Sequence, residues 1–173
     1  MKSILQVVII AILTFNYGCT TKEQSTVAPQ PTCSDQIQNQ GELGVDCGGP
    51  CNACPGKMTA KVDGVAWVSG GNVTSSTNNN SIIILAGNGT STISLIYTGS
   101  FVPGTFPLNS AIYSETLTQT NYLATSGSIT FSSWNEQNEV VSGSFSFTGI
   151  ESSGTGQTKS ITDGHFEFVP YHP

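Results

Sequence analysis

From Lys57 to the carboxyl terminus, short runs of alternating apolar and polar residues are separated by turn-forming residues. The clearest pair of runs spans 58–62 and 65–68, and Asp63-Gly64 lies between them. An Asp-Gly pair between alternating runs is typical of a two-residue β-hairpin turn, because both turn residues need positive φ angles. We therefore expect an antiparallel hairpin that buries one face, formed by Met58, Ala60, Val62, Val65 and Trp67.

Further runs predict more strands along the same region. Residues 82–86 are continuously apolar, which favours a central strand covered on both faces. Residues 92–98 alternate, and the clearest later hairpin joins 127–134 to 139–149. A second Asp-Gly pair, at 163–164, predicts another hairpin turn near the end of the chain.

Many short strands with frequent turns indicate an all-β fold, since no window shows a sustained helical period with caps. We expect an antiparallel β-sandwich, with a small β-barrel as the alternative. Residues 57–173 are enough for one domain with a single core.

The amino terminus resembles a bacterial lipoprotein signal at 1–18. Its apolar stretch, 4–15, is shorter than the roughly 20 residues that span a bilayer, and fits the apolar part of a secretion signal. Gly18-Cys19 is similar to a relaxed lipobox of Bacteroidota lipoproteins, although Asn16 stands where Leu is usual. We expect acylation of Cys19; ordinary signal cleavage and an uncleaved anchor are the alternatives.

Residues 19–32 are polar and contain Pro29 and Pro31, which is typical of a flexible tether. An acylated Cys19 would anchor this tether to a membrane without spanning it. The polar stretch 20–24 is similar to short export signals of Bacteroidota surface lipoproteins. We expect an exported protein that is anchored to the outer membrane, on the cell surface rather than facing the periplasm.

A short module at 33–56 holds the remaining cysteines, Cys33, Cys47, Cys51 and Cys54. An even number of cysteines in an exported segment predicts two disulfides, and the spacing leaves all three pairings open. A zinc site and a redox-active Cys-x-x-Cys pair are the alternatives.

Oxygen-bearing side chains lie between these cysteines, at Asp35, Asn39, Glu42 and Asp46. Carboxylate and amide oxygens on a glycine-rich loop are the ligands that Ca²⁺ prefers. We therefore predict a calcium site, and no other cofactor. The alternative is a solvated acidic loop in which these residues form turns.

The composition excludes nucleic acid as a partner. Charged residues make up 9% of the chain, the net charge is −6, and arginine is absent, so no basic surface is available for phosphates. The sequence shows no catalytic constellation, and we expect a non-enzyme; an enzyme is the minor alternative.

Alternation predicts the orientation of two aromatic residues. It places Trp134 on a polar face beside Asn135 and Asn138, where the indole could stack on a sugar ring. The alternative is that a β-bulge turns Trp134 inward. Alternation also places Phe168 on the same core face as Phe166.

Two segments resemble known families of exported bacterial proteins. The cysteine spacing and the run 44–49 are similar to a short module near the amino termini of exported Bacteroidota and myxobacterial proteins. Segments 58–67, 129–131, 141–149 and 161–166 resemble strand motifs of an uncharacterised Bacteroidota lipoprotein domain. We expect a surface lipoprotein that binds a glycan or a protein, or alternatively a structural component of the cell envelope.

Overall fold

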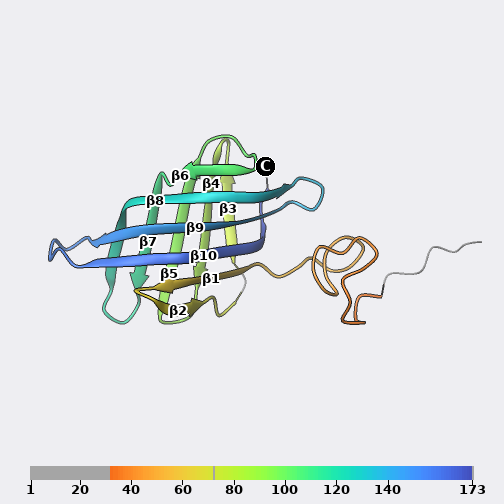
Figure 1. Cartoon of the computed structure of the whole chain (residues 1–173), viewed down its shortest axis with the longest axis horizontal. Coiled ribbons are helices and arrows are strands. Elements are labelled where there is room, and N and C mark those ends of the chain that lie inside the picture. Colours follow the sequence, from red (N-terminus) through yellow and green to blue (C-terminus); the bar gives the residue numbers. More distant parts are fainter. Residues whose placement is uncertain (1–31, 72, 173) are drawn as a thin grey trace, which may run out of the picture. The chain divides into compact units, whose positions relative to one another are not determined.

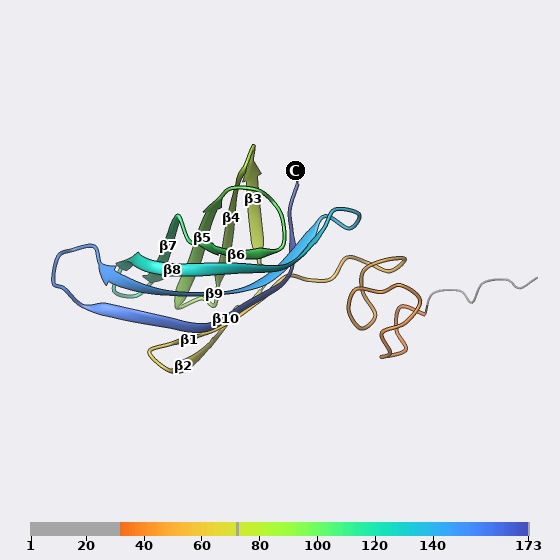
Figure 2. The same ribbon diagram turned by 45° about the horizontal axis from the view of Figure 1, so that its top comes forward.

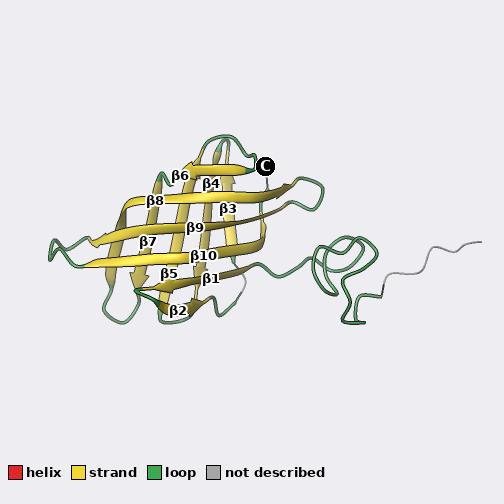
Figure 3. Cartoon of the chain, viewed as in Figure 1, coloured by secondary structure: helices red, strands yellow, loops and turns green. Residues whose placement is uncertain are grey.

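The computed structural model describes residues 32–71 and 73–172. All the regular secondary structure in this part of the chain consists of β-strands (Figure 3). The predicted lipidation site Cys19, the signal segment and the tether up to residue 31 lie outside the described residues. Within them, no helix has the length and apolar content that a membrane crossing needs. The strands are β1 (Lys57–Val62), β2 (Val65–Val68), β3 (Thr74–Asn78), β4 (Ser81–Gly87), β5 (Ser91–Thr98), β6 (Gly104–Pro107), β7 (Ser110–Glu115), β8 (Thr120–Asn135), β9 (Val140–Glu151) and β10 (Thr158–Pro170).

All ten strands belong to one antiparallel sheet, in the order β2-β1-β10-β9-β8-β7-β5-β4-β3, with β6 paired to β8. The sheet curls into a half-barrel, so that β1, β8, β9 and β10 cross β3, β4, β5 and β7 at a steep angle (Figures 1 and 2). The predicted all-β antiparallel fold is confirmed. The two layers expected of a sandwich are two halves of one continuous sheet, which strand twist allows to fold over itself.

The core lies inside this curl and is rich in aromatic rings. Phe131 is almost fully buried, and its ring centroid lies 5.0 Å from that of Tyr97, 4.7 Å from that of Trp134 and 6.0 Å from that of Phe166. These residues come from β5, β8 and β10, so the cluster connects the two halves of the sheet. Each tilted or edge-to-face pair adds about 1 kcal/mol to the free energy of burial.

The first hairpin has the predicted turn and register, but its predicted burial is wrong at Val65, which is 70% exposed beside the turn. Asp63 and Gly64 both have positive φ angles, 49° and 82°, and Ala60 pairs with Trp67 across the turn. Trp67 is buried, and its indole Nε1 donates a hydrogen bond of 2.8 Å to the Ser91 hydroxyl. The indole N–H therefore has a hydrogen-bond partner, as a buried tryptophan usually does.

The prediction that residues 82–86 are covered on both faces is wrong. Ile82, Ile84 and Ala86 are buried, whereas Ile83 and Leu85 are 41% and 45% exposed. A single curled sheet has one core and therefore buries only one face of β4. The continuous apolar run thus reflects an apolar outer surface as well as a buried inner one.

The second Asp-Gly pair does not form a hairpin turn. β10 continues through it, and its register against β9 shifts between Ile161 and Gly164. Asp163 takes a φ of 48°, while a Cβ on Gly164 would lie 2.6 Å from the Phe145 carbonyl oxygen. The pair forms part of a β-bulge instead. A bulge of this kind also uses a residue in the left-handed conformation, and Gly164 lets the backbones of β9 and β10 approach closely.

The later hairpin also forms as predicted, and it joins the two long strands β8 and β9. The Asn135 carboxamide oxygen closes the turn by accepting hydrogen bonds from the backbone and side-chain nitrogens of Asn138, at 3.0 and 3.2 Å. On β9, Val141, Phe145 and Phe147 are buried, as alternation predicts. The serines between them lie on the outer face.

Candidate functional site

Phe168 adopts a backbone conformation that is unusual for a bulky residue, and it does not occupy the predicted core face. Its φ is 51°, and the register of β10 against β9 shifts between Phe166 and Val169. This β-bulge inserts one residue, so Val169 takes the next core position and is fully buried. Phe168 is thereby turned out of the core.

A left-handed conformation costs a non-glycine residue on the order of 1–2 kcal/mol, so the surroundings must hold it in place. The backbone nitrogen of Phe168 donates a 3.1 Å hydrogen bond to the Ser142 hydroxyl on β9. The phenyl ring is half-buried and lies close to Gly44, where an added Cβ would be 3.3 Å from the ring. Strain of this kind is concentrated at functional sites, which makes Phe168 a pointer to one.

Beside Phe168, a pocket of about 340 Å³ opens on the outer face of β8, β9 and β10. We call it the outer pocket. Gly143 forms part of its lining, and a Cβ there would lie 2.1 Å from the Thr130 carbonyl oxygen and 2.6 Å from the Phe166 ring. Only glycine fits that close approach of the strands. The lining residues are Ser132, Ser142, Gly143, Ser144, His165, Phe166, Glu167 and Phe168.

Hydroxyl groups extend along the same face beyond the outer pocket. Ser128 pairs with Ser146 and Thr130 with Ser144 in the register of β8 against β9. A second hollow of about 210 Å³ follows, lined largely by serine and threonine of β8, β9 and β10. The face therefore offers rows of side-chain hydroxyls that can each donate and accept hydrogen bonds.

Trp134 does not lie on this polar face; of the two orientations considered, the structure has the one in which a β-bulge turns the indole inward. The register of β8 against β9 shifts between Phe131 and Ser133, which turns the indole towards the core. Phe101 stacks on it with ring centroids 4.7 Å apart, and Tyr171 meets it edge-on at 5.0 Å. The indole is therefore not exposed on the polar face, where it would have to lie in order to stack on a sugar ring.

The two asparagines predicted beside Trp134 lie in the β8–β9 turn, where Asn135 binds Asn138. Asn138 also lines a groove of about 420 Å³ together with Val140, Glu139 and His172. The imidazole Nδ1 of His172 lies 3.1 Å from the Glu139 carboxylate, and both side chains are largely exposed.

The four cysteines of the module form two disulfides, Cys33–Cys51 and Cys47–Cys54. This pairing is one of the three that the spacing had left open. Disulfide sulfurs have no thiolate to give to zinc, so the structure supports the predicted disulfides over the zinc alternative. The crosslinks stabilise a segment that has little backbone pairing of its own. Among its described residues, the one isolated β-bridge joins Gly44 and Cys47.

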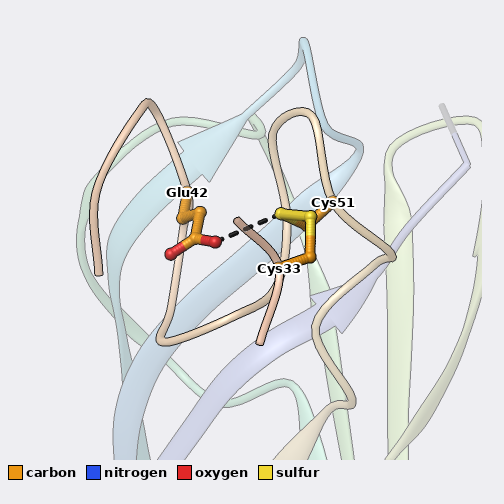
Figure 4. A group of neighbouring side chains, drawn as sticks. All are labelled: Cys33, Glu42 and Cys51. Carbon is orange, nitrogen blue, oxygen red and sulfur yellow. Dashed lines mark hydrogen bonds between the residues drawn. A yellow bond between two sulfur atoms is a disulfide. The ribbon is translucent and has the colours of Figure 1, made fainter. Parts of the chain in front are cut away.

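Glu42 is a buried acid, 7% exposed, that packs against the Cys33–Cys51 disulfide (Figure 4). Its Oε1 lies 3.1 Å from Cys51 Sγ. Because that sulfur is bonded to Cys33 and carries no hydrogen, the contact is a close sulfur–oxygen approach. The clustering of Cys33, Glu42 and Cys51 within 4.8 Å therefore does not make a metal-binding set.

The structure brings together the residues that we predicted to bind calcium. Asp46 accepts the backbone N–H of Asp35 at 2.9 Å, and Glu42 accepts those of Asn39 and Asp46, each at 3.2 Å. Hydrogen bonds from the Thr32 hydroxyl and the Asn39 amide lower the pKa of Asp35. These carboxylates organise the module through its own N–H groups, and calcium binding stays a prediction.

Ion pairs connect Lys61 on β1 and Lys159 on β10 to nearby acids. Lys159 lies 3.1 Å from Asp63 and 3.4 Å from Glu115, and Lys61 lies 2.9 Å from Asp163. The backbone N–H of Ser160 and the charge of Lys159 lower the pKa of Asp63. The Asp63-Gly64 turn is thus bonded to β10, through Ser160 and Lys159, as well as to the strands of its own hairpin.

These features define a class: an all-β half-barrel domain with a hydroxyl-lined outer pocket, preceded by a disulfide-crosslinked module. The chain belongs to the family described as a domain of unknown function, DUF6252, whose family model matches residues 55–170. The match begins just before β1 and ends with the last residue of β10, so it covers the whole sheet. No curated protein and no solved structure matches the chain.

Proposed function

We propose that this chain is an exported, lipid-anchored protein whose β domain binds a neutral glycan at the outer pocket without catalysing a reaction. The outer pocket beside Phe168 carries the proposal, since a strained aromatic residue, three serine hydroxyls, an imidazole and a carboxylate line one hollow. Sugar rings present apolar C–H faces to aromatic rings and hydroxyl groups to polar side chains. The lining of the outer pocket offers both kinds of contact.

The form of the pocket supports an extended ligand rather than a compact one. The outer pocket and the adjoining hollow lie on one face, and their volumes are about 340 and 210 Å³. The serines and threonines between them provide hydrogen-bonding groups along the whole length. A chain of several sugar units would use these groups in series.

The proposed anchor rests on the sequence alone. Gly18-Cys19 follows an apolar signal-like stretch, and a polar segment separates it from the module. A chain acylated at Cys19 would hold the β domain outside the outer membrane, on the cell surface. Mass spectrometry of the mature protein tests this directly, with a diacylated or triacylated amino-terminal Cys19 as the expected result.

A glycan array tests the binding proposal, with residues 20–173 as the probe. We expect wild-type binding to neutral oligosaccharides, near-complete loss with Phe168→Ala, and a loss of about fivefold with Ser144→Ala, the value for one hydrogen bond. Ser114→Ala is the matched control, because Ser114 lies on β7, outside the outer pocket. Binding that both serine variants weaken equally would contradict a role for this pocket.

A further inference from the structure

The two disulfides of the module differ in their exposure to solvent. Cys54 is only 6% exposed and Cys47 is half-buried, so reagents in solution have little access to the bond between them. Cys33 is exposed and Cys51 is half-buried, so the bond between these two presents one end to solvent. We call Cys33–Cys51 the exposed disulfide and Cys47–Cys54 the buried disulfide. Thiols attack sulfurs that they can reach, so burial protects the exposed disulfide less.

The carboxylate of Glu42 points towards the exposed disulfide (Figure 4). Its Oε2 accepts the backbone N–H groups of Asn39 and Asp46, each at 3.2 Å, and these two hydrogen bonds fix the side chain. Its Oε1 faces the disulfide and lies 3.1 Å from Cys51 Sγ. The carboxylate is thus held in direct contact with the half-buried sulfur of the exposed disulfide.

Reduction of the exposed disulfide by an external thiol takes two steps. A first thiolate attacks the accessible sulfur of Cys33, forms a mixed disulfide with it, and expels the sulfur of Cys51 as a thiolate. A second thiolate attacks the reductant's own sulfur in that mixed disulfide, which releases Cys33 as a thiolate. The protein disulfide has then gained two electrons, and the two reductant thiolates, which lose one electron each, leave joined as a disulfide.

We propose that Glu42 protects the exposed disulfide from reduction by external thiols. Attack at Cys33 must create the thiolate of Cys51 only 3.1 Å from the Glu42 carboxylate, and like charges that close repel strongly in a partly buried site. Attack at Cys51 would instead bring the incoming thiolate against the same carboxylate. One fixed charge therefore opposes exchange in both directions.

The two disulfides are accordingly protected in different ways, the buried one by limited access and the exposed one by charge. Glu42 makes no bond to either sulfur, so it acts as a positioning residue whose charge sets the rate of exchange. A crosslink of this kind persists in the presence of external thiols, although one of its cysteines is exposed. The protection does not depend on the proposed glycan or on the proposed lipid anchor.

Initial rates of reduction in the full chain test this proposal. Alkylation of the released thiols followed by peptide mass spectrometry measures each disulfide separately, with neutral 2-mercaptoethanol as the reductant. Glu42→Gln should raise the rate at the exposed disulfide about tenfold or more, because the amide oxygen still accepts both N–H groups while the charge is lost. The rate at the buried disulfide should change by less than about twofold, since its protection comes from burial.

Asp46→Asn is the matched control, because it removes the same charge and a similar hydrogen-bonding role. The Asp46 carboxylate also accepts two backbone N–H groups, from Asp35 and Gln36, but it does not belong to the close group of Glu42 and the exposed disulfide. This variant should change the rate at the exposed disulfide by less than about twofold. Equal acceleration in the two variants, or an unchanged rate in Glu42→Gln, would overturn the proposal.

The charge of the reductant provides a second readout, which a purely structural role of Glu42 would not change. Cationic cysteamine should reduce the exposed disulfide of the wild type faster than anionic 3-mercaptopropionate, once each rate is divided by that for the neutral disulfide of 2-mercaptoethanol. This preference should fall about threefold or more in Glu42→Gln. A preference that is absent from the wild type, or that is the same in wild type and Glu42→Gln, would show that Glu42 does not act through its charge.

Discussion

Phe168 lines the outer pocket with a left-handed backbone conformation, and the proposed site depends on it. Strict alternation places it beside Phe166 in the core, because a strand that contains no bulge exposes every second residue. The bulge before Val169 reverses this, and the Ser142 hydroxyl holds the resulting backbone turn. A sequence offers no local signal for such a bulge when the residue concerned is not Gly, Asn or Asp.

The backbone strain at Phe168 can be measured with two variants that both remove the ring. Phe168→Gly should be more stable than Phe168→Ala by about 1 kcal/mol, because glycine adopts a positive φ without a steric penalty. Urea denaturation of the two variants gives the difference in free energy of unfolding. If Phe168→Ala is the more stable of the two, the left-handed conformation is not present in solution.

Gly143 is expected to tolerate no side chain. Gly143→Ala would bring a Cβ to within 2.1 Å of the Thr130 carbonyl oxygen, so β8 and β9 must move apart. We expect a loss of about 1–3 kcal/mol in the free energy of unfolding, the usual range for overpacking. Gly71→Ala, where an added Cβ meets nothing within 4 Å, is the control and should change stability by less than about 0.5 kcal/mol.

The lowered pKa of Asp63 predicts a pH dependence of stability. A carboxyl group whose pKa is lower in the folded state than in the unfolded state contributes stability above its ordinary value of 3.8, and loses it as the pH falls through the folded value. Asp63→Asn should thus cost about 0.5–1 kcal/mol at pH 7, a value reduced because the side chain is 45% exposed.

Thermal unfolding of wild type and Asp63→Asn between pH 7 and pH 2 measures this dependence. The difference between the two proteins should shrink below pH 4, where the wild-type carboxylate takes up a proton. A difference that stays constant down to pH 2 would mean that the interactions of Asp63 with Ser160 and Lys159 do not depend on its charge.

At the scale of elements, two of the three predicted hairpins form, whereas two of the β-bulges were not predicted at all. The Asp63-Gly64 turn and the turn closed by Asn135 depend on residues that are adjacent in sequence. The shifts near Asp163, Phe168 and Ser133 depend on which strand lies opposite, and that information is spread over the chain. For the same reason, no local pattern indicated that Trp134 contacts Phe101 across the fold.

The disulfide pairing was equally beyond the sequence, because all three pairings satisfy the spacing. Once formed, the Cys33–Cys51 bond closes a loop of 18 residues and the Cys47–Cys54 bond a loop of 7. Loop-closure entropy gives about 3 and about 2 kcal/mol for loops of these lengths. The module has no regular strand in the described chain, so it depends on both crosslinks.

Limited proteolysis measures what the longer crosslink contributes. The double variant Cys33→Ser, Cys51→Ser should be cleaved within 33–54 at least tenfold faster than wild type, while the sheet from β1 to β10 remains intact. The corresponding variant of Cys47 and Cys54 should show a smaller effect, because its loop is shorter. Unchanged cleavage in both variants would mean that the module is ordered without its disulfides.

At the scale of the whole molecule, hydroxyl groups and exposed apolar groups occupy different outer parts of the sheet. Serine and threonine line the outer face of β8 to β10, where Glu167 and His165 also line the outer pocket, whereas Ile83 and Leu85 are exposed on β4. This separation follows from the order of strands in the sheet, which no single segment of the sequence contains.

The central claim is that a neutral glycan binds at the outer pocket, and chemical-shift mapping tests it most directly. Residues 20–173, labelled with ¹⁵N, would be titrated with a mixture of neutral oligosaccharides, and the amide shifts of Gly143, Ser144 and His165 followed. The account predicts saturable shifts at these residues and their neighbours, and their loss in Phe168→Ala. Shifts that are absent, or that are confined to the cysteine module, would contradict it.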